Sequence, residues 1–104
     1  MQKHTKIYLD ALGYNDTDFI PSEISGQKAV DIHHIISRGK GGKDRIENLM
    51  ALTREEHLNF GDKKEWMYFL LIRHYDFLIK KGVAFDKSWF DKNFDKYEDI
   101  LLYI

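Results

Sequence analysis

The sequence of 104 residues contains no cysteine, which excludes disulfide bonds and thiolate metal sites. Neither sign of charge prevails, because 16 Lys and Arg residues stand against 17 Asp and Glu residues. No apolar run approaches the roughly 20 residues of a membrane-spanning helix, and polar residues follow Met1 where a signal peptide would have its apolar core. We therefore expect a soluble, cytoplasmic protein whose net charge does not indicate its partners.

Hydrophobic residues make up 43% of the chain and aromatic residues 14%, enough to bury a core that offsets the entropy of ordering. A chain of this length supports one core and is too short for two. Because strand-like and helical patterns both occur, we expect a single α+β domain.

Two short strands are expected in the first half of the chain. The alternation of β-branched and polar residues predicts a strand over Ala29–His33, and Leu49–Leu52 predicts an antiparallel partner. The segment between them, Ser37–Lys43, has three glycines and no periodicity, so it is expected to be a loop.

Capping signals and helical periodicity predict helices around this hairpin. Four are expected: over Lys6–Leu12 after Thr5, from Arg54 after a Thr53–Glu56 capping box, over Lys63–Lys81 after an Asp62–Glu65 capping box, and after Asp86 or Ser88. The apolar residues expected to share one face of the third helix are Trp66, Phe69, Leu70, Phe77 and Leu78. Those that recur at helical spacing in the fourth helix, and are assigned to the core, are Trp89, Phe90, Phe94, Tyr97, Ile100 and Leu101.

Histidines mark the end of the first strand and the start of the second predicted helix. His33 and His34 are adjacent, and His57 lies in the first turn of its helix or just beyond. Neutral imidazole is a metal ligand and a base that titrates near neutrality. A hairpin followed by a helix can bring the three rings together, although periodicity alone does not require it. His4 and His74 are interpreted as ordinary polar positions.

Positive charge gathers in the glycine-rich stretch between Gly26 and Arg45. Five cations lie there, Lys28, Arg38, Lys40, Lys43 and Arg45, against Asp31 and Asp44, a local excess of three. Such a patch can bind phosphates on a protein of neutral charge, whereas a merely solvated loop is the alternative.

The segment from Val30 to His57, VDIHHIISRGKGGKDRIENLMALTREEH, resembles the HNH endonuclease family of ββα-metal nucleases. The family pattern runs from an Asp-His or His-His pair through a glycine-containing loop to Asn-Leu and a helical histidine. The resemblance covers residues of about 21–61, in the style of colicin-type nucleases and small phage-encoded HNH proteins. It implies one HNH nuclease domain over residues 1–104, with a helical extension over about 62–104.

The resemblance also implies an activity and a set of roles. The protein would be a DNA endonuclease that uses one divalent cation, Mg²⁺ or Mn²⁺ ahead of Ni²⁺ or Zn²⁺. His34 would be the general base, with its other ring nitrogen held by a backbone carbonyl, and His33 and His57 would ligate the cation. Asn48 would tie the loop across the hairpin. The DNA phosphates would be contacted by Arg38, Lys40, Lys43 and Arg45.

The sequence departs from the family pattern in two places. Many members carry a further histidine or asparagine where this chain has Gly61; Asp62 and Asn59 are considered as substitutes but not assigned. Many members also bind a structural zinc through cysteines, and the matching positions here are Ser22, Ser25, Thr53 and Glu56. We therefore expect no structural zinc.

Two other functions stay open. The chain could be a catalytically inactive HNH-fold module that binds nucleic acid, or a phage-encoded module that binds another protein through its aromatic-rich helices. A single active site per chain favours nicking of one DNA strand unless two copies associate.

Overall fold

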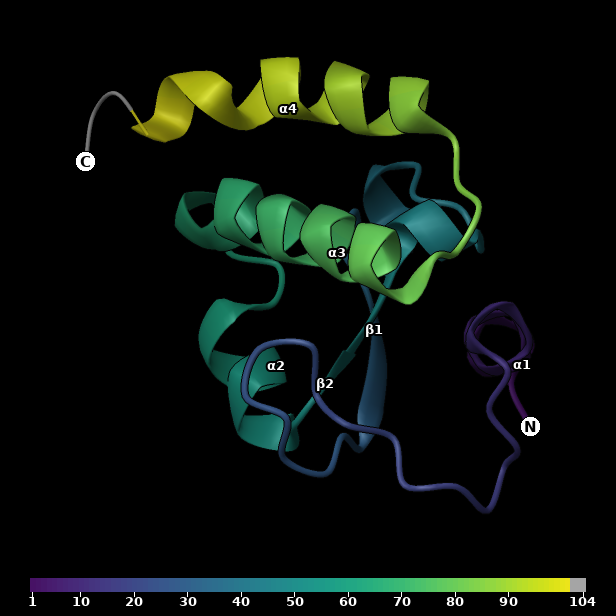
Figure 1. The fold of residues 1–104 in the computed structure, drawn as a ribbon. Coiled ribbons are helices and arrows are strands. Elements are labelled where there is room, and N and C mark those ends of the chain that lie inside the picture. Colours follow the sequence, from purple (N-terminus) through teal and green to yellow (C-terminus); the bar gives the residue numbers. More distant parts are fainter. Residues whose placement is uncertain (102–104) are drawn as a thin grey trace.

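A two-stranded antiparallel hairpin lies at the centre of the structure, a computed structural model that describes residues 1–101 and the side chains of residues 1–98 (Figure 1). Strand β1 (Asp31–His34) pairs with β2 (Leu49–Leu52), so that His33 lies opposite Met50 and His34 opposite Leu49. Helix α1 (Lys3–Leu12) covers one side of the hairpin and α2 (Arg54–Phe60) the other. The expected α+β fold class is confirmed.

All four residues of β2 are buried because the strand is covered on both faces. Leu49 and Ala51 pack in a small cluster with two residues of α1, Tyr8 and Leu9. Met50 and Leu52 point the other way, into the larger core. Side chains of a strand alternate between its faces, so β2 joins the two cores.

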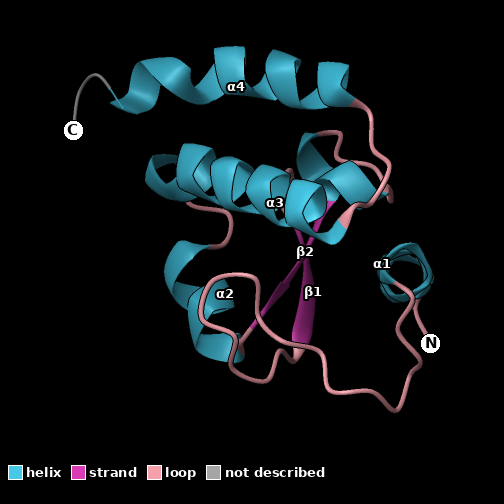
Figure 2. Cartoon of the chain, viewed as in Figure 1, coloured by secondary structure: helices cyan, strands magenta, loops and turns pink. Residues whose placement is uncertain are grey.

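Helices α3 (Met67–Lys81) and α4 (Lys87–Leu101) pack side by side above the hairpin (Figure 2). Their contact is rich in aromatic rings, with Phe90 fully buried against Tyr75. Short 3₁₀ turns connect the elements at Arg38–Lys40, Ile46–Asn48 and Lys64–Trp66. No helix in the described part of the chain is long and apolar enough to cross a membrane.

Several predicted elements agree with the structure in their bounds. The strand Leu49–Leu52 is confirmed, as is the helix from Arg54 with its reciprocal Thr53–Glu56 capping box. The Asp86 carboxylate accepts hydrogen bonds from the backbone N–H and the hydroxyl of Ser88, at 3.0 and 2.6 Å, at the start of α4. Local signals of this kind depend on residues within one helical turn.

Other predicted boundaries are wrong. Helix α1 starts at Lys3 after Gln2, so Thr5 lies inside it rather than at its cap. The second capping box is absent, because Asp62 adopts a left-handed conformation (φ 59°) and α3 begins only at Met67. Trp66 is 37% exposed and not part of the core. Ile100 and Leu101 lie outside the described side chains.

His74, expected to be an ordinary polar position on the long helix, is completely buried. Its Nδ1 lies 2.7 Å from Glu23 Oε1, and its Nε2 lies 2.7 Å from the Ile46 carbonyl oxygen. Both partners are acceptors when Glu23 is ionised, so both ring nitrogens donate and the ring is an imidazolium. The Tyr8 hydroxyl donates to the other Glu23 oxygen at 2.7 Å, so the buried ion pair also holds α1.

Burial by itself lowers the pKa of His74, but the Glu23 carboxylate and the Ile46 carbonyl raise it by a larger amount. The net pKa is therefore above the usual value of 6.5. A pKa raised in the folded state stabilises the fold fully below the unfolded pKa, and this contribution is lost as pH rises through the folded pKa. We expect the free energy of unfolding to fall as the pH rises above about 6.5 and through the raised pKa of His74. Urea unfolding at several pH values measures this dependence.

A His74→Phe variant should lose this pH dependence together with about 3–5 kcal/mol of unfolding free energy, because Glu23 stays buried without a counter-charge. Tyr8→Phe removes one hydrogen bond to the same carboxylate and should cost about 2 kcal/mol. If His74→Phe unfolds at the wild-type urea concentration, the buried pair is not ionised.

Candidate functional site

The two adjacent histidines of β1 point to opposite faces of the hairpin. His33 is paired with Met50, on the face that α2 covers, and His34 is paired with Leu49, on the face that α1 covers. The ring centroid of His33 accordingly lies 4.7 Å from that of His57 on α2. The ring centroid of His34 lies 4.6 Å from that of His4 on α1. The alternation of a strand thus gives each histidine a different helix as its neighbour.

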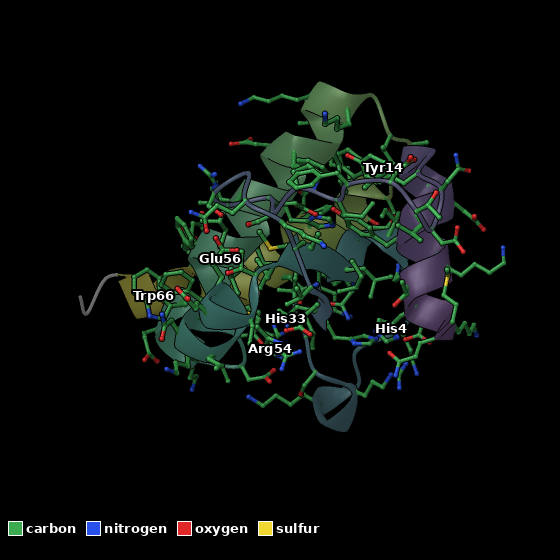
Figure 3. The ribbon with its side chains drawn as sticks, turned by 90° about the horizontal axis from the view of Figure 1, so that it is seen from below. His4, Tyr14, His33, Arg54, Glu56 and Trp66 are labelled. Carbon is green, nitrogen blue, oxygen red and sulfur yellow. The ribbon has the colours of Figure 1, made fainter. Side chains whose placement is uncertain are left out.

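A cleft of about 450 Å³ opens at this place, between α1 and α2. Its lining includes His4, His33, His34, Arg38, His57 and Asp62. Figure 3 shows His33 and Arg54 near the middle of the molecule, with His4 facing them from α1. Three segments of the chain therefore bring imidazoles to one opening.

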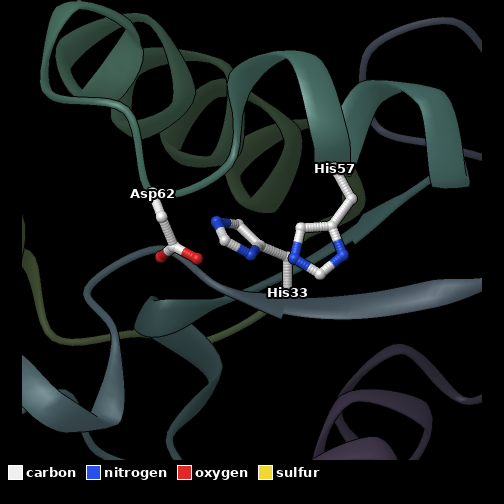
Figure 4. A group of neighbouring side chains, drawn as sticks. All are labelled: His33, His57 and Asp62. Atoms are coloured by element: carbon white, nitrogen blue, oxygen red, sulfur yellow. The ribbon is translucent and has the colours of Figure 1, made fainter.

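His33, His57 and Asp62 form a cluster in which the potential ligand atoms all lie within 4.8 Å of one another (Figure 4). His33 Nε2 is buried and has no hydrogen-bond partner among the described residues. Burial and the nearby His57 ring lower the pKa of His33 to about 4, so the ring is neutral at physiological pH. A neutral imidazole with a free nitrogen beside a second imidazole and a carboxylate fits a divalent cation.

The position considered for a further ligand, Gly61, has no room for a side chain. A Cβ atom there would lie 2.5 Å from the His57 carbonyl oxygen and 3.0 Å from Cε1 of His33. The next residue, Asp62, adopts the left-handed conformation that aspartate tolerates better than most residues, and its carboxylate reaches the two histidines. The third group of the cluster therefore comes from Asp62, which the sequence did not assign.

Asp31 orients His57 within this cluster. Its Oδ2 lies 3.0 Å from His57 Nδ1, and Arg54 donates to both carboxylate oxygens at 2.8 and 3.2 Å. Partial burial acts to raise the pKa of Asp31, but the hydrogen bonds from Arg54 and His57 hold it below its usual value. With Nδ1–H donated to this carboxylate, Nε2 of His57 is the nitrogen left to bind a cation.

The position of Asp31 in the sequence indicates its place beside His57. Asp31 stands two residues before His33, and a strand places such residues on the same face. The carboxylate therefore lies on the side of the hairpin where α2 packs, next to His57.

His34 is held by a carboxylate rather than by the backbone carbonyl that we expected. Its Nε2 lies 2.7 Å from Oδ1 of Asp44, which also accepts a hydrogen bond from Arg38 at 3.1 Å. The hydrogen bonds from His34 and Arg38 lower the pKa of Asp44, so the carboxylate is ionised and accepts from Nε2–H. Nδ1 of His34 is then the nitrogen that carries the lone pair.

Asn48 is fully buried and clamps the glycine-rich loop. Its Oδ1 accepts from the Ile36 N–H at 2.7 Å, and its Nδ2 donates to the carbonyl oxygens of Ile36 and Lys43 at 3.0 and 3.1 Å. Gly42 passes so close to Ile36 that a Cβ atom would collide with its carbonyl oxygen. These contacts fix the loop immediately before Asp44, the residue that holds His34.

Of the four cationic side chains expected to contact DNA, Arg38 lines the cleft. Lys40 and Lys43 are exposed on the loop and do not contribute to the cleft lining. Arg45 is half-buried and pairs with Glu47 at 2.8 Å and Asp86 at 3.3 Å. Its guanidinium therefore connects the loop to the start of α4.

The four positions compared with zinc cysteines carry a cluster of oxygen groups. The Ser22 hydroxyl donates to Glu56 Oε1 at 2.5 Å and accepts from the backbone N–H groups of Ile24 and Ser25. Glu56 also accepts from the Thr53 N–H at 2.9 Å. Hydrogen bonds thus join the turn after Pro21 to the start of α2.

Comparison with protein families matches residues 20–63 to the family described as HNH endonuclease. This span holds both strands, α2, the His33–His57–Asp62 cluster and His34. The match covers nearly the same segment as the resemblance read from the sequence, about 21–61, so this part of the chain is similar to HNH endonuclease domains. Comparison with curated proteins and with solved structures finds no match.

We predict that Asp62→Ala weakens Mn²⁺ binding at least about tenfold, because loss of an outer-shell partner alone commonly costs that much. Gly61→Ala should weaken it as well, since its Cβ atom displaces His57 and His33. Asp76→Ala, an exposed carboxylate on α3, serves as the matched control. Titration calorimetry measures the affinities, and equal affinity of Asp62→Ala and wild type would remove Asp62 from the site.

Removal of divalent cations should leave the fold intact. The site is open and has few protein ligands, so a cation contributes stability only through mass action. We expect a chelator to shift the melting temperature by no more than about 5 °C, roughly the effect of 1 kcal/mol on a domain of this size. The far-ultraviolet circular dichroism should not change. Unfolding on chelation would instead indicate a structural metal bound elsewhere.

Proposed function

We propose that this chain, whose residues 20–63 match the HNH endonuclease family, is a metal-dependent DNA endonuclease that hydrolyses phosphodiester bonds. One observation carries the proposal: Nε2 of His33, buried and without a hydrogen-bond partner in the described part of the chain, lies in a cluster with His57 and Asp62, and His34 lines the same cleft. A cation site and a base beside one opening are the two parts that metal-assisted hydrolysis needs.

His33, His57 and Asp62 are the groups that would hold the cation. A set of two imidazoles and one carboxylate accepts Mg²⁺ or Mn²⁺ and also suits Ni²⁺ or Zn²⁺. When bound, a cation at this place supplies Lewis-acid stabilisation of the phosphate and of the charge that develops on the leaving 3′ oxygen.

His34 acts as the general base in this proposal. Its Nδ1 takes a proton from water as the water oxygen bonds to phosphorus and the bond from phosphorus to the 3′ oxygen breaks. Asp44 keeps the proton on Nε2 beforehand and stabilises the imidazolium that forms. Asn48 acts indirectly, because its hydrogen bonds to Ile36 and Lys43 set the loop that carries Asp44.

DNA would be held chiefly by its phosphates. Arg38 is 60% exposed at the cleft, so its guanidinium can bind a phosphate next to the scissile bond. Lys40 and Lys43 would contact the backbone further along the duplex. Arg45 is the least suited of the four, since Glu47 and Asp86 occupy its guanidinium. Among the described residues, one cleft carries both His34 and the His33–His57–Asp62 cluster, which supports nicking of a single strand unless two copies associate.

The test is cleavage of supercoiled plasmid with added Mg²⁺, Mn²⁺ or Ni²⁺. We expect His34→Ala to lower the rate at least about 100-fold while DNA affinity stays near that of wild type, because a base acts in the transition state. His33→Ala and His57→Ala should regain part of their activity at high Mn²⁺, whereas His34→Ala should not.

The same assay separates the alternative functions. A nucleic-acid-binding module without catalysis would bind DNA but leave the plasmid intact with every metal. A protein-interaction module would do neither. Near wild-type cleavage by His34→Ala would show that another group is the base.

A further inference from the structure

His4 lines the cleft but has no role in the reaction proposed above. It lies in the first turn of α1, is partly buried and lines the same opening as His33 and His34. The family match begins at residue 20, so this helix lies outside the matched span. A histidine from a separate element therefore reaches the centre of the site.

His4 belongs to a closed cycle of contacts between four side chains, which are those of His4, Arg38, Asp44 and His34. Arg38 donates to Nδ1 of His4 at 3.4 Å and to Asp44 at 3.1 and 3.3 Å. Asp44 binds Nε2 of His34 at 2.7 Å, and the His34 ring lies 4.6 Å from the His4 ring, between centroids. Each of the four side chains thus touches two of the others.

Within this cycle of contacts His4 restrains two other side chains, those of Arg38 and His34. Arginine only donates hydrogen bonds, so Nδ1 of His4 must be the acceptor that keeps the guanidinium at the cleft. The His4 ring, inclined by 46° to the His34 ring, limits the rotation of His34, because the hydrogen bond from Nε2 to Asp44 by itself leaves the ring free to tilt. One residue therefore restrains both a phosphate-binding group and the base.

Helix α1 is a firm support for such a restraint. One turn after His4, Tyr8 is fully buried and its hydroxyl donates to the buried carboxylate of Glu23. Leu9 is also buried, in the cluster with Leu49 and Ala51 of β2. Functional side chains are positioned best when they stand on elements fixed by packing of this kind.

We propose that His4 is a positioning residue of the active site, which holds the His34 ring for proton transfer and the Arg38 guanidinium for a DNA phosphate. The proposal rests on the endonuclease function proposed above. It makes α1 part of the active site, although this helix lies outside the segment that matches the family.

The kinetic test compares His4→Ala with His4→Phe on the plasmid substrate. Misplacement of a reacting group by about 1 Å can cost on the order of 100-fold, so we expect His4→Ala to lower kcat about 10- to 100-fold and to raise KM several-fold. His4→Phe keeps a ring against His34 but offers Arg38 no acceptor. It should recover most of the lost kcat and keep the raised KM.

Asp10→Ala is the matched control, because Asp10 is exposed on the same helix and pairs only with Lys6 among the described residues. Its kcat and KM should stay within about twofold of wild type, as expected for a surface substitution. The proposal is overturned if His4→Ala also stays within that range, or if Asp10→Ala loses as much activity as His4→Ala.

A spectroscopic measurement tests the positioning without any cleavage. Long-range ¹H–¹⁵N correlation spectra of the imidazole rings, recorded without added metal, report which nitrogen of His34 is protonated. Wild type should show the proton on Nε2, held by Asp44, and His4→Ala should show shifts averaged between the two tautomers. Unchanged His34 shifts in His4→Ala would refute the role of His4. A wild-type protein that cuts no DNA would refute only the endonuclease function.

Discussion

Successive side chains of a strand point to opposite faces, and at the end of β1 this constraint acts on two adjacent histidines. His33 turns toward α2, where burial keeps it neutral, and His34 turns toward α1 and the glycine-rich loop. A slip of one residue between the strands would exchange the two environments. The pairing of β1 with β2 therefore decides which ring lies in the cluster with His57 and Asp62 and which lies beside Asp44, and so which role each would take in the proposed reaction.

The same arrangement of hydrogen bonds orients His57 in the candidate cation cluster and His34, the proposed base. A carboxylate accepts a hydrogen bond from one ring nitrogen and leaves the other free: Asp31 does so for His57, and Asp44 for His34. An arginine in turn fixes each carboxylate, Arg54 in the first case and Arg38 in the second. Fixed tautomers matter because a cation and an attacking water each require an unprotonated nitrogen at a defined place.

The polar interior connects the two walls of the cleft. Glu23 receives the Tyr8 hydroxyl from α1 and the charged His74 ring from α3, and the adjacent Ser22 binds Glu56 at the start of α2. A buried ion pair contributes little net stability compared with an apolar core, because both charges lose their hydration. Its directional hydrogen bonds instead hold the elements in one mutual arrangement, and the geometry of the cleft depends on that arrangement.

How far the sequence could predict this structure depends on the distance between interacting residues. The strand Leu49–Leu52, the capping box of α2 and the approach of His57 to His33 were predictable, since each rests on alternation, a helical turn or a known motif spacing. The position of Asp62 was not, because the collision that excludes a side chain at Gly61 arises only once α2 packs on β1.

The sequence by itself determined the α+β class, the hairpin followed by a helix, and the identity of the histidines, because these follow from neighbours along the chain. Only the tertiary structure decided that Asp44 holds His34, that His4 packs beside it, and that His74 is buried against Glu23. The last pair lies 51 residues apart in the sequence. Contacts of this range leave no periodic pattern, since they form only where packing brings distant segments together.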